Sequence, residues 1–377
     1  MKAAVITILL ASVISVPVSA AILSADPSNL TKVFAAAKDG DTIKASGTFK
    51  SMALQNRTFA TRVTLDATDA VFADTLTIKN VHGLNVLRGT FGSKTEMMRS
   101  LRSVSVQTSS NIKFQSNKFI GTGAIGTRDA DIGMTIRESK LVQVSGANFS
   151  NLRLGIGVSS SNNIKLGSNK FVAMTSDGIN IANSHRVTAT SNNCSGTSIF
   201  LGAHPDCIQL WSVLGQPVQS DIALIRNVAT GATQGFTSFN PQDGGGLRIS
   251  MIGNIVSTTF PQGIACYNCV DSTFTDNVIT TPLEAKWRTM MHIKYGTNNF
   301  IANNSIGQKP GSIPGPGVSL RTLASGASLS RMSLAGGIAN NVTGVPEPSE
   351  WLLLTIGFGL VGYFNRRPQM TLQRRSA

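Results

Sequence analysis

Residues 109–119 read SSNIKFQSNKF and residues 160–171 read SSNNIKLGSNKF, so nearly the same pattern occurs twice. Ile112 and Ile164 hold the same place in the two copies and lie 52 residues apart, which two turns of about 26 residues each would explain. Residues 179–192, INIANSHRVTATSN, alternate apolar and polar side chains with the period of two typical of half-buried strands. The repeat therefore predicts a solenoid of short strands.

An asparagine recurs at a similar place in successive repeats. The set is Asn169, Asn193, Asn227, Asn254, Asn277 and Asn304. An asparagine amide can hydrogen-bond backbone groups at a sharp bend, and equivalent residues of stacked strands lie about 4.8 Å apart. We therefore expect a ladder of asparagine side chains along one bend of the coil.

These segments resemble the right-handed parallel β-helix of the pectate-lyase-like superfamily, over about residues 22–340. The resemblance implies an all-β fold, a solenoid of three-strand coils. Residues 29–49, NLTKVFAAAKDGDTIKASGTF, read as an amphipathic helix, a Gly-Asp turn and a strand. Families of this type begin with such a capping helix, which covers the apolar core that the first coil would otherwise expose. A shared fold does not by itself assign a function.

The N-terminus carries a secretion signal. Lys2 precedes an apolar run, and the small residues of PVSA at 17–20 follow it. A basic start, a short apolar stretch and a small-residue cleavage site predict a signal peptide over residues 1–20, removed by signal peptidase.

The last segment, residues 343–377, resembles the PEP-CTERM sorting signal of Gram-negative bacteria. It contains a motif, an apolar run and a basic end: Pro346-Glu347-Pro348, residues 351–364, and Arg366 with Arg367. The apolar run is marginal in length for a transmembrane helix, and the two arginines would hold its end on the cytoplasmic side. The resemblance implies a C-terminal hydrophobic helix, a transient anchor in the inner membrane, and cleavage by an exosortase.

Residues 21–342 remain as one expected β-helix domain. The chain has a formal net charge of +14, of which about +11 falls in this domain, and such an excess attracts polyanions through its long-range field. For an exported protein the expected partner is an acidic polysaccharide. The chain has no nucleic-acid recognition motif, so nucleic acid is not expected as a partner. We expect a monomer, located at the cell surface or outside the cell.

Four cysteines occur in this domain. An even number in an exported protein favours disulfides over a metal site. The simplest of the three possible pairings joins Cys194 to Cys207 and Cys266 to Cys269.

Seven segments place apolar residues at alternate positions, so the residues between them face solvent. Aligning the segments predicts three outward columns. The first column holds Asp177, Asp206, Gln234 and Gln262. The second holds Thr135, Asn180, Gln209, Thr237 and His292. The third holds Arg137, Trp211, Phe239, Tyr267, and either Lys294 or Tyr295.

The candidate catalytic residues are Asp177, His204, Asp206 and His292. Asp177 and Asp206 would stand on adjacent coils, where one carboxyl can serve as an acid and the other as a base or nucleophile. The same pair is a candidate calcium site, because calcium takes several oxygen ligands. His204 is a candidate base that Asp206 would orient.

The candidate polysaccharide-binding residues are Gln209, Trp211, Phe239, Tyr267, Lys294, Arg137 and Arg288. Trp211, Phe239 and Tyr267 follow one another at intervals of 28 residues and predict an aromatic ladder. Pyranose rings stack on such aromatic planes, although a ladder buried under a loop would serve packing alone.

Acidic and basic residues on one face favour a lyase or an epimerase for an acidic exopolysaccharide. Such an enzyme needs a base for the C5 proton and cations for the charge that develops. A non-catalytic polysaccharide-binding or biofilm matrix protein is the main alternative. A glycoside hydrolase using Asp177 and Asp206 is another, and a purely structural solenoid is the last.

Overall fold

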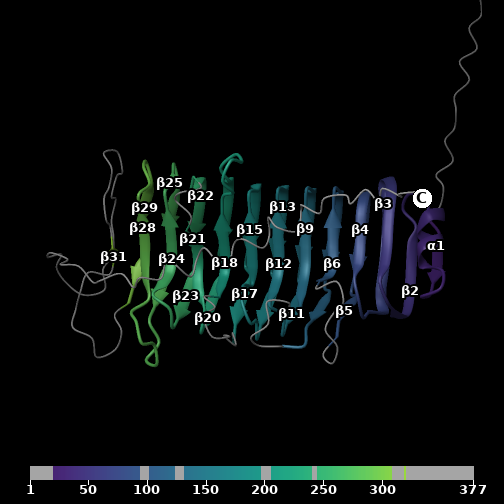
Figure 1. The fold of residues 1–377 in the computed structure, drawn as a ribbon, viewed down its shortest axis with the longest axis horizontal. Helices are drawn as coiled ribbons and strands as arrows, with labels where there is room; N and C mark the ends of the chain where they lie inside the picture. Colours follow the sequence, from purple (N-terminus) through teal and green to yellow (C-terminus); the bar gives the residue numbers. More distant parts are fainter. Residues whose placement is uncertain are drawn as a thin grey trace, which may run out of the picture. The chain divides into compact units, whose positions relative to one another are not determined.

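The computed structural model describes residues 20–93, 102–123, 131–196, 205–239, 244–307 and 318–319. In these parts the chain forms one helix, α1 (Leu30–Ala36), and parallel strands that pair only with strands of neighbouring coils. It winds as a right-handed parallel β-helix of about nine turns (Figure 1). The predicted fold class and its three strands per coil are therefore confirmed.

The first sheet, called sheet I, carries the outward columns predicted above. After the first parts of β3 (Met52–Phe72) and β4 (Leu76–Leu87), it contains β6 (Arg102–Gln107), β9 (Ile132–Arg137), β12 (Leu154–Ser159), β15 (Ile179–Ala182), β18 (Asp206–Trp211), β21 (Gln234–Ser238), β24 (Gln262–Tyr267), β28 (Met290–Lys294) and β31 (Val318–Ser319).

Sheet II follows sheet I in each coil. It contains β1 (Ile22–Ala25), β2 (Thr42–Phe49), the later parts of β3 and β4, β7 (Ser110–Gln115), β10 (Lys140–Ser145), β13 (Asn162–Gly167), β16 (His185–Thr190), β19 (Ser220–Ile225), β22 (Gly246–Ile252), β25 (Cys269–Val270), β26 (Thr273–Thr275) and β29 (Phe300–Ala302).

Sheet III closes the coil with short strands. After the ends of β2 and β3, it contains β5 (Thr90–Gly92), β8 (Lys118–Ile120), β11 (Asn148–Ser150), β14 (Lys170–Val172), β17 (Asn193–Ser195), β20 (Val228–Gly231), β23 (Ile255–Thr258), β27 (Val278–Thr280) and β30 (Ser305–Ile306).

The 52-residue repeat corresponds to two coils, as predicted. Lys113 pairs with Gln143, and Gln143 pairs with Lys165, so the two coils are 30 and 22 residues long rather than 26 each. The lengths differ because the connections between sheet III and sheet I vary, while the strands keep their register.

Phenylalanine rings fill the inside of sheet III. Six of them stack with centroids 4.4–5.0 Å apart: Phe49, Phe72, Phe91, Phe119, Phe149 and Phe171. Across the core, sheet I has a glycine opposite two of these rings. A Cβ on Gly155 would lie 2.5 Å from both Cδ1 of Phe171 and the carbonyl oxygen of Gly178, and one on Gly133 would lie 2.8 Å from Cδ1 of Phe149 and 2.7 Å from the carbonyl oxygen of Gly155. The rings and the backbone of the next coil therefore explain the glycines of these two segments.

A disulfide occupies the core position that follows the last ring of the stack. Cys194 pairs with Phe171 in sheet III, and its partner Cys207 follows Gly178 in the glycine column of sheet I. The second disulfide joins Cys266 to Cys269 within one coil. Both predicted pairings are confirmed, and the four sulfurs are buried.

A buried asparagine ladder runs along the bend between sheets II and III. Asn192 accepts hydrogen bonds from the backbone N–H and the amide of Asn169. In turn its amide donates to the backbone carbonyl oxygen of Leu166 and to the side-chain Oδ1 of Asn227. The sequence prediction chose Asn193 for this place, and it was wrong by one residue. Asn193 instead begins β17 and is exposed, because its strand position points outward.

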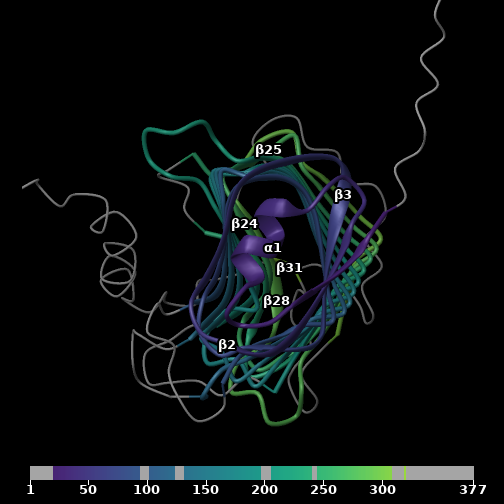
Figure 2. The same ribbon diagram turned by 90° about the vertical axis from the view of Figure 1, so that its right-hand side faces the viewer.

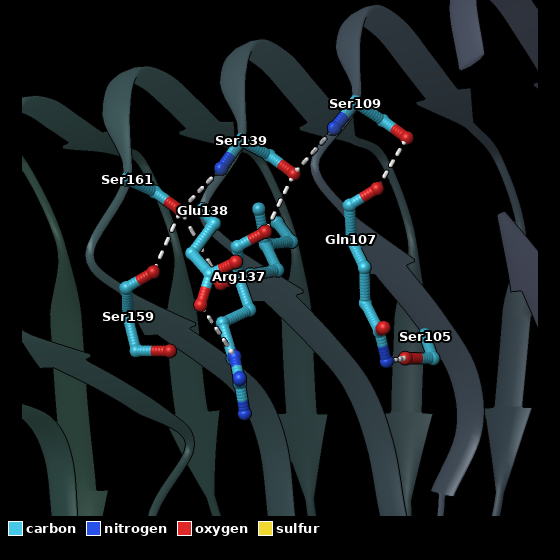
Figure 3. A network of polar contacts seen from close by, with 9 residues as sticks. Ser105, Gln107, Ser109, Arg137, Glu138, Ser139, Ser159 and Ser161 are labelled. Atoms are coloured by element: carbon cyan, nitrogen blue, oxygen red, sulfur yellow. Dashed lines mark hydrogen bonds and ion pairs between the residues drawn. The ribbon is translucent and has the colours of Figure 1, made fainter. Parts of the chain in front are cut away.

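The complete ladder is Asn117, Asn169, Asn192, Asn227, Asn254, Asn277 and Asn304, with Ala147 at the coil between the first two. A second ladder follows the bend between sheets I and II (Figure 3). There Ser139 Oγ accepts from the N–H of Ser109, and Ser161 Oγ accepts from the N–H of Ser139. Both ladders satisfy backbone N–H groups that the sheets cannot pair at a bend.

The predicted capping helix is present as α1. Its buried Leu30 and Phe34 face the core, and Phe34 contacts Phe59 edge-on with centroids 5.7 Å apart. Viewed along the stack, α1 lies across the middle of the coil (Figure 2). Gly40 then adopts a φ of 80° at the predicted turn before β2. The helix therefore shields the first coil from water, as expected.

The predicted targeting signals fall largely outside the described residues. This holds for the signal peptide except Ala20, and for the whole sorting segment with Pro346, Glu347, Pro348, Arg366, Arg367 and its apolar run. No helix in the described ranges has the length and apolar content needed to cross a bilayer.

We predict that Asn192→Ala lowers the free energy of unfolding by about 2–4 kcal/mol, because it leaves buried backbone groups without partners. Its neighbour Asn193 provides the control, since that side chain is exposed. Asn193→Ala is expected to change the free energy by no more than about 0.5 kcal/mol. Urea titration followed by circular dichroism measures both. Equal losses in the two variants would contradict the assignment of the ladder to Asn192.

We also predict that Gly155→Ala destabilises the coil by about 1–3 kcal/mol, because the new methyl group collides with the Phe171 ring and with the carbonyl oxygen of Gly178. Gly157 lies on the same strand but points outward, and a Cβ there meets nothing closer than 3.3 Å. Gly157→Ala is therefore the matched control and should be tolerated. Thermal melting of the two variants decides the matter. If Gly155→Ala melts with the wild type, the rings do not fix that glycine.

Candidate functional site

The outer face of sheet I has the register that the sequence predicted. Through the mid-strand column, pairing runs in the order Ser105, Thr135, Gly157, Asn180, Gln209, Thr237, Ala265 and His292. In the third column Lys294, and not Tyr295, pairs with Tyr267. The open choice of register at β28 is thereby resolved.

Asp206 lies at the start of β18 and is 1% exposed. Its Oδ1 accepts a hydrogen bond of 2.6 Å from the Thr237 hydroxyl, and its Oδ2 accepts one of 3.3 Å from Gln209 Nε2. Its backbone N–H donates to Oδ1 of Asp177 at 3.0 Å. Buried polar groups need such partners. The carboxylate of Asp206 is therefore held in place on both of its oxygens.

Asp177 precedes β15 on the adjacent coil and is half-buried, so it is the more accessible of the two carboxylates. Its Oδ2 accepts a hydrogen bond of 3.2 Å from Asn180 Nδ2, which also donates to Gln209 Oε1 at 2.7 Å. The indole of Trp211 donates to Oδ1 of Asn180 at 2.7 Å. These contacts join the two aspartates through Asn180 and Gln209. We call Asp177, Asn180, Asp206, Gln209, Trp211 and Thr237 the sheet I network.

The aromatic ladder is present, but part of it is covered. The rings of Phe239 and Tyr267 meet edge-on at 5.4 Å, and Tyr295 meets Tyr267 edge-on at 6.2 Å. The Lys294 ammonium lies 5.2 Å from the Tyr267 ring centre. Tyr267 is only 9% exposed. Little of its ring is therefore available for sugar stacking, which favours the alternative that this part of the ladder serves packing.

The other predicted site residues lie away from the two aspartates. His292 is three strands beyond Gln209 in the same column, a separation of about 14 Å, and its Nε2 lies 3.2 Å from the carbonyl oxygen of Pro261. Arg137 is three strands before Trp211 and pairs with Glu138 at 3.1 Å. His292 therefore does not lie beside Asp177 and Asp206.

Arg288 lies in the connection between β27 and β28, next to the strand that carries His292 and Lys294. Burial lowers the pKa of its guanidinium from the ordinary value, yet arginine stays protonated at neutral pH. His204, the predicted base, lies outside the described residues.

Asn180 and Thr237 were predicted in an outward column but not as site residues. Gln234, which pairs with Asp206 and is 6% exposed, was likewise not predicted as a site residue. Within the described ranges, Oε1 of Gln234 has no hydrogen-bond partner. The sequence did contain a signal for these residues, because polar side chains recur in the columns that hold the aspartates.

The pair Asp177 and Asp206 does not fit a calcium site in the described residues. Calcium needs six to eight oxygen ligands, and both Asp206 oxygens already accept hydrogen bonds from Thr237 and Gln209. Nor do three His, Cys, Asp or Glu side chains of these ranges come together as a metal site. What the network can do is present one reachable carboxylate, Asp177, held by an amide and a backbone N–H.

Neither a family model nor a curated protein matches the sequence. Among solved structures, the chain is similar to pectate lyase Pel9A, with 13% identity over 83% of this chain and 80% of that one and a TM-score of 0.45. It is also similar to a mannuronic-acid-specific polysaccharide family 6 lyase from human gut microbiota. The identity is 12%, the match covers 76% of this chain and 74% of that one, and the TM-score is 0.47. A third similar structure is an alginate lyase from Paenibacillus sp. str. FPU-7. Its identity is 16%, the match covers 76% of this chain and 98% of that one, and the TM-score is 0.42. Nothing about the chemistry of this chain follows from similarities at this level.

We predict that Asp206→Asn lowers the free energy of unfolding by about 1–3 kcal/mol, because a neutral amide has only one oxygen for the two buried donors and loses the charge-assisted hydrogen bonds from Thr237 and Gln209. Asp177→Asn is the matched control on the adjacent coil. Its side chain is half-exposed, so water can replace a lost partner and the loss should be smaller. Chemical denaturation at neutral pH measures both variants. A larger loss in Asp177→Asn would contradict the structural role given to Asp206.

Proposed function

We propose that this protein is exported and acts on an acidic polysaccharide along the outer face of sheet I, as a lyase or an epimerase. One observation carries the proposal, namely that the face of sheet I that presents a reachable carboxylate in a hydrogen-bonded network also has a column with a cationic residue on either side of that network. Asp177 supplies the carboxylate, and Arg137 and Lys294 supply the cations.

The spacing of these cations suits a chain that lies along the solenoid. Arg137 and Lys294 are each three strands from Trp211 in the third column, so about 29 Å separates them. One coil rises by about 4.8 Å, which is close to the length of one pyranose unit along a 1,4-linked chain. A uronate chain lying along this column would bring a carboxylate near each cation while its middle passes Trp211, whose indole donates to Asn180 of the sheet I network.

In the proposed reaction a base takes the proton from C5 of a uronate. In a lyase, the electron pair then forms the C4–C5 double bond and the glycosidic oxygen leaves from C4 with a proton. In an epimerase, a proton returns to the opposite face of C5. We assign the base to Asp177 or His204, and we assign binding of the substrate carboxylates to Arg137, Arg288 and Lys294. Positively charged groups stabilise the charge that develops on the carboxylate.

Export belongs to the proposal and rests on the ends of the sequence. The basic and apolar start supports removal by signal peptidase. The Pro-Glu-Pro motif with its apolar run and arginines supports sorting by an exosortase to the surface of a Gram-negative bacterium. An exported protein with a charge of +14 would meet acidic polysaccharide there.

The second candidate is a polysaccharide-binding matrix protein without catalysis. The burial of Asp206 favours it, because a carboxylate that is 1% exposed and bonded on both oxygens serves the fold. The same burial disfavours the glycoside hydrolase, since both carboxyl groups of a hydrolase must reach the sugar.

We predict that the wild-type protein produces unsaturated uronates from polymannuronate, polyguluronate or polygalacturonate, and that Asp177→Asn lowers the rate at least about 100-fold by removing the base. Ultraviolet absorbance measures elimination, and proton NMR of the uronate configuration measures epimerisation. Asp69→Asn is the control, because it removes an exposed carboxylate elsewhere in the coil and should leave the rate unchanged. Binding with neither reaction on all three polymers would favour the matrix protein instead.

A further inference from the structure

The outer face of sheet II carries a hollow that the sheet I network does not use. Its volume is about 500 Å³, and four consecutive strands, β7, β10, β13 and β16, form its floor. The side chains that matter for binding are Arg62, Leu141, Gln143, Asn163, Lys165 and Arg186. This face is separate from sheet I, because each coil turns through the serine ladder between the two sheets (Figure 3).

Cations dominate the hollow, and the two arginines differ from the two lysines. Arg62 donates to the backbone oxygen and the side-chain oxygen of Asn111. Lys165 is exposed on β13 and Lys113 lies at the margin, two strands away in the same column. Neither ammonium group makes a hydrogen bond or an ion pair with any residue in the described ranges. In Arg186, Nε donates to the side-chain oxygens of Asn162 and Asn163, which fixes the guanidinium and leaves its two terminal nitrogens for a ligand.

The nearest acid is paired mainly with an arginine outside the hollow, and its charge also acts on Arg186. Asp221 lies at one end of the hollow, and both of its oxygens accept hydrogen bonds from Arg248, at 2.6 and 2.8 Å. This pairing lowers the pKa of Asp221 to about 2. The outward residues of β7, β10, β13 and β16 include no other carboxylate.

The neutral side chains between the cations suit a sugar. Gln143 lies between Lys113 and Lys165 in the column, and Asn163 and Thr188 flank Lys165. These groups both donate and accept hydrogen bonds, as hydroxyl groups require. No aromatic side chain lines the hollow, whereas single-stranded nucleic acid is usually held by stacking its bases on aromatic rings.

We infer that the hollow on sheet II binds a segment of an acidic polysaccharide, as a second site that holds the chain while the sheet I network acts on it. The choice of ligand class rests in part on the proposed function. Lys113 and Lys165 lie two strands apart, about 10 Å, so they would contact the carboxylates of alternate sugars. Arg62 and Arg186 would bind the same chain from the side.

The test is binding of a fluorescently labelled polygalacturonate oligomer to the full chain, followed by fluorescence anisotropy. Asp177→Asn serves as the background so that the oligomer is not cut. The test variant carries Lys165→Gln with Arg186→Gln. The control carries Lys118→Gln with Lys170→Gln, which removes the same charge from exposed positions on sheet III. Urea titration checks that both variants remain folded.

We expect the test variant to bind at least about tenfold more weakly, because charge-assisted hydrogen bonds are lost, and the control to change by less than about twofold. Equal weakening in both variants would overturn the inference, because it would show only a general attraction to positive charge. Equal binding of a labelled oligodeoxynucleotide, with the same sensitivity to the test variant, would also overturn it.

Failure of this inference and failure of the proposed function give different results. If the wild type cuts uronates while the test variant binds as well as the control, the second site is wrong and the proposed function stands. If the wild type cuts nothing while the test variant alone loses binding, the second site stands and the enzyme proposal is wrong.

Discussion

The stack of phenylalanine rings inside sheet III is the contact on which the rest of the coil depends. Each ring lies on the one from the previous coil, with centroids 4.4–5.0 Å apart. Each such pair contributes about 0.5–1.5 kcal/mol beyond its burial. Opposite Phe149 and Phe171 the rings leave no room for a side chain, so sheet I carries glycine there. From Cys194 onward the disulfide to Cys207 fills the same space by a covalent bond.

This packing makes the outside of the coil as regular as its inside. Along a strand, a residue that points inward makes its two neighbours point outward. Because the strands keep their register from coil to coil, each outward side chain also lies directly above its equivalent on the next coil. Two polar surfaces result, the carboxylate and amide network of sheet I and the cationic hollow of sheet II. Asp177 belongs to the first surface and Lys165 to the second. A long polymer that follows the axis can contact several coils of either surface at once.

Much of this arrangement could be predicted from the sequence. The 52-residue repeat gave two coils, the segment 29–49 gave the capping helix, and the cysteine positions gave both disulfides. The column that contains Asn180 and Gln209 followed from alternation alone. Alternation fixes whether a residue points inward or outward, but it does not fix what lies over an outward residue. That is why Tyr267 was predicted as an open sugar platform, and why Asp206 was predicted as a reachable carboxylate.

The sequence by itself determined the period, the direction of each side chain in a strand, and therefore which residues share a column. Only the tertiary structure decided which asparagine enters the ladder, since Asn192 and Asn193 differ by one position at a bend where alternation is interrupted. It also decided that Asp206 is closed off and Asp177 is reachable, because the Thr237 side chain reaches Asp206 from the next coil and the Gln209 side chain reaches it from the same strand. The hollow beside Lys165 and Arg186 likewise forms only when four coils stack, because no single repeat contains enough side chains to enclose it.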